Sequence, residues 1–153
     1  MPSSSDSDKP RAWNPDTLPT PAPSYDQVAV TPILPTSKLV TLAGQTGTRV
    51  DGTTPIDFLE QVKGAYRNVH EALKAAGATP RDIIHVRHYI VTKTGNEKLD
   101  EIDVVERGWD KLWIAFMDEF GEGHRPPDTV LGVASLALGG LHYEVECWAI
   151  VHG

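Results

Sequence analysis

Hydrophobic and polar residues alternate along two runs near the end of the chain. DTVLGVASL at 128–136 and HYEVECWAI at 142–150 each have the period of a β-strand with one buried face. A third run, DIIHVRHYIV at 82–91, is rich in β-branched residues, and earlier strands are predicted at 25–30 and 38–47. Gly139 and Gly140 fit a tight turn between the last two strands, which predicts that these strands are neighbours.

Two segments have the period of an amphipathic helix. The first is predicted between the capping residues Thr53 and Thr54, followed by Pro55, and the stop signal Gly77. A second, continuous helix is predicted over 97–120, with Gly108 as a weak point. Their apolar stripes are Phe58, Val62, Ala65, Val69 and Leu73 in the first, and Leu99, Ile102, Val105, Trp109, Leu112 and Phe116 in the second.

The order of the elements, ββ-α-β-α-ββ, predicts an α+β domain with a mixed sheet and two helices on one face. Two helices cannot cover both faces of such a sheet, so we expect copies of the chain to bury the remaining face in a homo-oligomer with clefts between subunits. Residues 1–24 are rich in Pro and Ser and are predicted to be a flexible or extended segment before the domain at 25–153.

Composition narrows the functional classes. The formal net charge of −7 argues against a general binder of nucleic acid or anionic membranes. Cys147 is the only cysteine, which excludes an internal disulfide; a buried inert thiol is the simpler interpretation and a nucleophile the alternative. No apolar run is long enough to span a bilayer, and the N-terminus has no apolar signal core, so a cytoplasmic location is predicted.

Three carboxylates lie on the last two predicted strands. Glu144 and Glu146 share one face of the final strand, opposite its apolar residues. On the strand before it, we expect the bulkier set to face the helices, which places Asp128 and Val130 on the side of the glutamates. Crowded carboxylates in a partly dry cleft suit proton transfer. The alternative is that they form structural ion pairs with Arg or Lys across an interface.

Other polar residues give weaker signals. His85 and His88 stand three apart on a predicted strand, hence on opposite faces, which indicates one surface and one core histidine and no shared metal. The glycine-rich run GQTGTRVDG lacks the ending of a phosphate loop and is predicted to be a turn. Trp109 and Trp113 are predicted to be core or interface residues.

Several segments together resemble one family. LAGQTG, AYRNVHEALKAAGATPRDIIHVRHYIV and RPPDTVLGVASLALGGLHYEVECWAIV are similar to the YjgF/YER057c/UK114 group, also called the Rid (reactive intermediate deaminase) family. The resemblance covers nearly all of the chain from Asn14 to the end. It implies a chorismate-mutase-like fold, a homotrimer, and three clefts in which enamines or imines such as 2-aminoacrylate are hydrolysed without a cofactor.

The resemblance also implies roles for individual residues. Glu144 matches the glutamate that positions the attacking water, Tyr25 the tyrosine that closes the pocket, and Gly44 the glycine of the strand-end turn. Asp128 stands where the family has the arginine that binds the substrate carboxylate, so the charge is reversed. Arg125 and Arg87 are the candidates to replace that arginine through a different geometry, and Val130 is an expected substrate contact.

These expectations favour an enzyme that uses Glu144 and Asp128 for acid–base chemistry on a substrate other than 2-aminoacrylate. Hydrolysis of a C=N bond, enamine–imine tautomerisation and cyclisation all fit a neutral or cationic substrate. A trimer that binds a ligand without catalysis is the alternative. Ribonuclease activity is disfavoured by the negative charge and the lack of a basic stripe.

Overall fold

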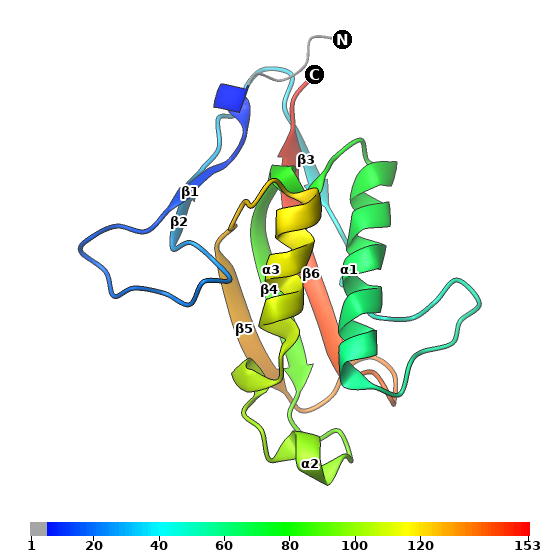
Figure 1. The fold of residues 1–153 in the computed structure, drawn as a ribbon. Helices are drawn as coiled ribbons and strands as arrows, with labels where there is room; N and C mark the ends of the chain where they lie inside the picture. Colours follow the sequence, from blue (N-terminus) through cyan, green and yellow to red (C-terminus); the bar gives the residue numbers. More distant parts are fainter. Residues whose placement is uncertain (1–5) are drawn as a thin grey trace.

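The computed structural model describes residues 6–153, and its centre is a four-stranded sheet with two helices on one face (Figure 1). The strand order is β3-β6-β4-β5, in which β4 and β5 are parallel and the other neighbours antiparallel. Helices α1 and α3 both pack on the same side of β4 and β6. The predicted α+β class and mixed sheet are therefore confirmed. The bounds are β3 Lys38–Thr41, α1 Phe58–Ala75, β4 Ile83–Val91, α2 Glu97–Asp100, α3 Trp109–Phe120, β5 Asp128–Val133 and β6 Tyr143–Val151.

The last two strands are not neighbours, contrary to the prediction from Gly139 and Gly140. β4 lies between β5 and β6, so residues 134–142 cross the end of β4 instead of forming a hairpin turn. β5 gains parallel pairing with β4, and β6 gains two antiparallel neighbours at the centre of the sheet. The consequence is that Asp128 and Glu144 lie on strands separated by a third strand.

Helix α1 confirms the first predicted stripe, because all five of its apolar residues are buried. The helix starts three residues later than Pro55, at the point where the Asp57 side chain accepts a hydrogen bond from the backbone N–H of Glu60. Gly77 has φ of 75°, the left-handed conformation that favours glycine after a helix end.

The second predicted helix is divided into three pieces. After α2 come a 3₁₀ turn at Val104–Glu106 and then α3, and Gly108 precedes α3 with φ of 86°. The buried guanidinium of Arg107 donates hydrogen bonds to the carbonyls of Val91, Thr92 and Ile102, which fixes the interruption against the end of β4. The single helix over 97–120 was therefore wrong, and Ile102 and Val105 are exposed instead of lying in an apolar stripe.

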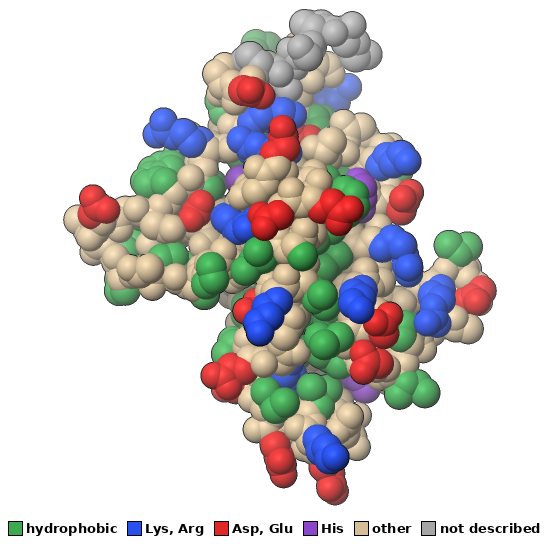
Figure 2. All heavy atoms as spheres, in the orientation of Figure 1, with side chains coloured by type: hydrophobic (Ala, Val, Ile, Leu, Met, Phe, Trp, Pro, Cys, Tyr) green, Lys and Arg blue, Asp and Glu red, His purple; other side chains and the backbone are tan. Residues whose placement is uncertain are grey.

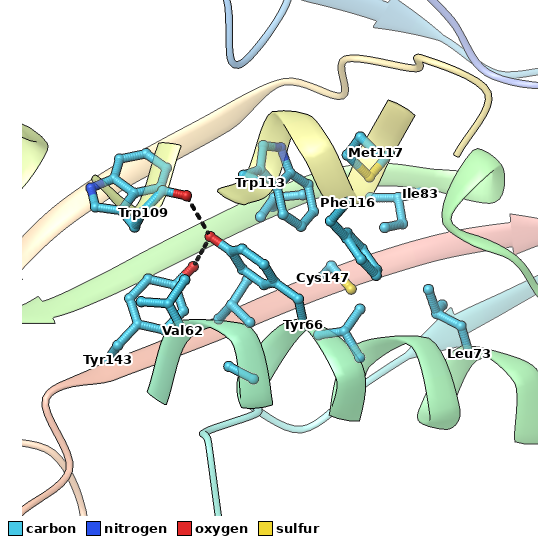
Figure 3. Packing of buried hydrophobic residues seen from close by; sticks show 14 of the residues in the cluster. Val62, Tyr66, Leu73, Ile83, Trp109, Trp113, Phe116, Met117, Tyr143 and Cys147 are labelled. Carbon is cyan, nitrogen blue, oxygen red and sulfur yellow. Dashed lines mark hydrogen bonds between the residues drawn. The ribbon is translucent and has the colours of Figure 1, made fainter. Parts of the chain in front are cut away.

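The core between the helices and the sheet is strongly aromatic (Figure 3). Tyr66 of α1 packs against Trp113 and Phe116 of α3 and against Tyr143 of β6, with ring centroids 5.2–5.8 Å apart. Cys147 is buried in this core, and burial raises the pKa of its thiol to about 12, which supports the inert interpretation. No helix in the described part of the chain is both long and apolar enough to cross a membrane.

The segment before the main sheet has ordered contacts with it that the sequence did not predict. β1 (Arg11–Trp13) pairs with β2 (Val28–Val30) in a separate two-stranded sheet, drawn in blue at one side of Figure 1. Lys9 forms a 2.7 Å ion pair with the buried carboxylate of Asp82, and Arg81 donates to the carbonyl of Pro10. Residues 22–25 lie beside β5, where Arg125 donates to the carbonyl of Pro23 and the backbone N–H of Asp26 donates to the carbonyl of Arg125. Residues 1–5 of the predicted N-terminal segment lie outside the described residues.

Candidate active site

Glu144 lies on the face of the sheet that no helix covers. It is opposite Tyr89 on β4, while its neighbours Tyr143 and Val145 point into the core. The carboxylate lies directly over Gly44, where the Cβ of any other residue would overlap the Glu144 side chain. Two backbone hydrogen bonds between Gln45 and Val145, of 2.8 and 2.9 Å, hold the turn against β6. The structure therefore brings together Glu144 and Gly44, two of the candidate site residues, on the uncovered face.

The two glutamates of β6 differ in their partners. Glu146 forms a 2.9 Å ion pair with Arg87, which lies opposite it on β4. Glu144 forms no ion pair and no side-chain hydrogen bond with any of residues 6–153. Glu146 thus has a structural ion pair, but within one chain and not across an interface as considered above, whereas Glu144 is the carboxylate left available to a ligand or to another subunit.

Asp128 lies on the opposite face of the sheet, so the prediction that it shares the side of Glu144 is wrong. In the parallel pairing of β5 with β4, Asp128 is opposite Val86 and Val130 is opposite His88. Both partners are fully buried beneath the helices. The Asp128 side chain is only 4% exposed, and its Oδ2 lies 3.4 Å from Nε2 of His88.

The prediction failed because side-chain bulk does not decide which way an edge strand faces. On the helix side of β5, a Cβ at Gly132 would lie 3.0 Å from Cγ2 of Thr92 and 3.7 Å from Cγ2 of Val104. Small residues are needed where the chain around Val104 lies so close to the strand. The bulky Leu131 faces the uncovered side and is 37% exposed.

Tyr25, Asp128 and Val130 meet in a cavity of about 340 Å³ between the N-terminal segment, α3 and β5. Ser24, Trp109 and Asp110 also line it; the sequence did not indicate a site role for any of these three. Among residues 6–153, those that line the cavity include two carboxylates and no Lys, Arg or His. Three of the predicted site residues are thus together here, on the other side of the sheet from Glu144, Gly44 and Arg87.

Neither candidate arginine lies beside Asp128. Arg87 is on the uncovered face, paired with Glu146. Arg125 is in the loop before β5, as predicted, where it forms a 2.6 Å ion pair with Asp118 and donates to the carbonyl of Pro23. Arg125 therefore holds the N-terminal segment that carries Tyr25, and it does not line the cavity.

The histidines of β4 lie on opposite faces, as the spacing predicted. His88 is fully buried and His85 is half-buried on the uncovered face. No group of three or more His, Cys, Asp or Glu within residues 6–153 could hold a metal ion. Charges of both signs are scattered over the helix side, with no basic stripe there (Figure 2).

Comparisons with known proteins agree with this fold. Residues 16–151 match the family model described as endoribonuclease L-PSP. A Rid-family protein from Yersinia pestis, YyfB, has a crystal structure with a TM-score of 0.75 and 26% identity, covering 94% of this chain and 99% of its own. Rv2704 of Mycobacterium tuberculosis, a member of the YjgF/YER057c/UK114 family, is 28% identical over 83% of this chain and 86% of its own, with a TM-score of 0.54.

A curated relative, the RutC family protein YjgH of Escherichia coli K12, is 47% identical over 51 residues. That match spans 33% of this chain and 39% of the relative. The family model, which covers most of the chain, and the solved structures lead to the same assignment. The chain belongs to the YjgF/YER057c/UK114, or Rid, family.

Proposed function

We propose that the protein is a cofactor-independent enzyme that hydrolyses or tautomerises enamines or imines in a cleft between subunits. The observation that carries this proposal is the difference between the two glutamates of β6. Glu146 forms an ion pair with Arg87, whereas Glu144 lies over Gly44 and forms no ion pair with any of residues 6–153. A carboxylate placed in this way can take a proton from water or from a substrate carbon.

A site that uses both Glu144 and Asp128 must combine two protomers, because the two residues lie on opposite faces of one sheet. The uncovered face supports such an assembly. It carries Leu39, Trp148 and Leu131, which are 58%, 41% and 37% exposed, and apolar surface of this kind marks an interface. We expect a homotrimer, in which Asp128 of one subunit and Glu144 of the next line the same cleft.

The substrate is expected to differ from 2-aminoacrylate. Asp110 in the cavity repels a carboxylate, Asp128 offers it no positive charge, and none of the described residues that line the cavity is basic. A substrate whose nitrogen end is neutral or cationic fits better. Arg87 is the residue that could contact a carboxylate near Glu144, at the cost of its ion pair with Glu146.

The decisive experiment compares Glu144→Gln with Glu146→Gln. Imines are generated in the assay from different amino acids by an amino-acid oxidase, and release of ammonia is followed. We expect Glu144→Gln to lose on the order of 100-fold or more in kcat, and Glu146→Gln to stay within a few-fold of the wild type. Equal rates for Glu144→Gln and the wild type would remove Glu144 from the mechanism.

The second candidate is a trimer that binds a small molecule without transforming it. The aspartate at position 128 favours it, since the expected arginine is absent. A ligand that binds tightly and is recovered chemically unaltered would support this function. Gain of imine hydrolysis in Asp128→Arg would show that the cleft can support this chemistry once a cation is present at position 128.

Ribonuclease activity has no support from the surface charge. The net charge is −7, and phosphate backbones are bound through Lys and Arg. If RNA cleavage copurifies with the protein, we expect it to persist in Glu144→Gln and in His variants, which would identify it as a contaminant.

A further inference from the structure

A row of buried hydrogen-bonding side chains runs beneath the cavity and ends at Asp128. The hydroxyl of Tyr66 donates to the backbone carbonyl of Trp109 at 3.2 Å, and the hydroxyl of Tyr143 donates to that of Tyr66 at 2.9 Å (Figure 3). Nδ1 of His88 lies 2.6 Å from the Tyr143 hydroxyl, and Nε2 of the same ring lies 3.4 Å from Oδ2 of Asp128. Four elements, α1, β6, β4 and β5, thus contribute one side chain each.

The direction of these hydrogen bonds fixes where the protons are. A carbonyl can only accept, so the one proton of the Tyr66 hydroxyl is used on Trp109. The one proton of the Tyr143 hydroxyl is used on Tyr66. The Tyr143 oxygen can then only accept from His88, which means that Nδ1 of His88 carries a proton.

This assignment has a consequence at the other ring nitrogen. A neutral imidazole protonated at Nδ1 has a lone pair at Nε2, and this lone pair would face a carboxylate oxygen of Asp128. Both atoms are buried, and neither has a hydrogen bond to another group among the described residues. Two buried acceptors facing each other are strongly unfavourable unless a proton lies between them.

We propose that His88 and Asp128 share one proton and that Asp128 presents it to a ligand in the cavity. Asp128 is then a proton donor, and His88 is a positioning residue behind it. The second oxygen, Oδ1, has no hydrogen bond within residues 6–153, and the side chain lines the cavity beside Tyr25, Trp109 and Asp110.

The surroundings of His88 disfavour a positive charge on its ring. Burial lowers the pKa of His88, and contact with Asp128 opposes this only in part. On one side the ring is covered by Trp109, with centroids 4.4 Å apart, and Trp113 meets it edge-on. Burial also raises the pKa values of Tyr66 and Tyr143, so both hydroxyls stay protonated. In the part of the cavity lining that the structure describes, the only other carboxylate is that of Asp110 on α3.

The role of this pair rests on the proposed imine chemistry. Water adds to the carbon of a C=N bond while Glu144 of the neighbouring subunit takes one of its protons. The π electrons of the C=N bond form a new N–H bond with the proton from Asp128. Glu144 then returns its proton to the nitrogen, a second proton moves from the added hydroxyl to Asp128, the C–N bond breaks, and the products are a carbonyl compound and an amine or ammonia. The class of substrate is therefore one whose imine nitrogen, without a neighbouring carboxylate, enters the cavity of Asp128.

The test of the proton assignment is ¹⁵N NMR of the histidine side chains in the full chain. We expect His88 to be protonated at Nδ1 in the wild type and in Asp128→Asn, whose amide can donate to Nε2. In Tyr66→Phe the Tyr143 proton has no acceptor and turns toward His88, so the ring should switch to protonation at Nε2. Phe58→Leu is the packing control, since Phe58 meets Tyr143 edge-on at 6.1 Å, and it should leave the tautomer unchanged. An Nε2–H tautomer in the wild type would overturn the proposal.

Kinetics separate this proposal from the function on which it rests. We expect Tyr66→Phe to lower kcat on the order of 10-fold with little change in KM, and Phe58→Leu to leave both nearly unchanged. If no imine is turned over but the Nδ1–H tautomer is found, the proposed function fails and the proton pair stands. If turnover depends on Glu144 but His88 carries its proton at Nε2, the pair fails and the function stands.

Discussion

The acidic residues on the two faces of the central sheet differ in burial and in their partners. On the uncovered face, Glu144 and Glu146 are partly exposed, and one of them is paired with Arg87. On the helix face, Asp128 is almost completely buried and meets a histidine that is itself buried. The chemistry of the uncovered face therefore depends on what covers it, whereas the chemistry of the helix face is set within one protomer.

Under the proposed function, this difference means that one chain alone would not form a complete site. The face of Glu144 is not covered by another element of the chain, and the cavity of Asp128 does not contain the carboxylate that we propose activates water. An assembly that places the uncovered face of one subunit against the cavity of another would complete both. The predictions below test this division, beginning with the change of largest expected effect.

Trp148→Arg should dissociate the assembly and abolish activity. Trp148 lies on the uncovered face of β6, 41% exposed, and a charge there would be buried in the proposed interface. Ile102→Arg is the matched control, because Ile102 is 42% exposed but lies after α2 and away from the sheet. Light scattering and the ammonia assay measure the two effects. An active, fully assembled Trp148→Arg protein would contradict the proposed interface.

Gly44→Ala should reduce kcat on the order of 100-fold and leave the assembly intact. A Cβ at this position would overlap the Glu144 carboxylate, which must then move away from its present place. Gly139→Ala is the control, since a Cβ there has nothing within 4 Å. Unchanged kinetics in Gly44→Ala would show that the position of the Glu144 carboxylate is not critical.

The sequence predicts which way the side chains face on β6 but not on β5. β6 is a central strand between two neighbours, so its alternation alone shows which residues are buried, and the face of Glu144 follows. β5 is an edge strand whose inward side is limited by close packing at Gly132, and that packing depends on the chain near Val104. The alternation of hydrophobic and polar residues along β5 does not reveal this contact between distant segments.

The buried row under the cavity was beyond prediction for a related reason. His88 and Tyr143 are 55 positions apart, and Tyr143 and Tyr66 are 77 apart, so no local spacing connects them. The sequence indicated only that one of His85 and His88 lies in the core. In contrast, the division of the second helix had local signals, because Asn96 and Asp103 both cap new turns and Gly108 adopts a left-handed conformation.

Acid should destabilise the protein mainly through histidines on the helix side. Burial lowers the pKa of His124 from 6.5 to about 4, and its Nε2 is 2.7 Å from the carbonyl of Ile83. The unfolded chain binds a proton at a higher pH than the folded chain does, so the stability contributed by neutral His124 is complete above pH 6.5. It is lost as the pH falls toward 4. We expect the free energy of unfolding to fall by roughly 2 kcal/mol across this range from His124 alone.

Urea denaturation at several pH values measures this loss. His124→Gln should be less stable at neutral pH but should show a flatter decline in acid. His85→Gln, on the uncovered face where the ring is only partly buried and burial also lowers its pKa, should flatten the decline less than His124→Gln does. A slope that is unchanged in His124→Gln would assign the acid sensitivity to other groups.

The ion pair between Arg87 and Glu146 should have the smallest effect in an isolated protomer. Its side chains are 43% and 29% exposed, and pairs of this kind contribute roughly 0.2–1 kcal/mol. A double-mutant cycle with Arg87→Ala and Glu146→Ala, made in the dissociated Trp148→Arg background, should give a coupling energy in that range. In the assembled protein the same pair would be covered and removed from water, so loss of one partner would leave a buried charge and the coupling energy should rise. An equal coupling energy in both backgrounds would mean that this part of the sheet stays exposed to solvent in the assembly. The proposed interface would then not cover Glu144.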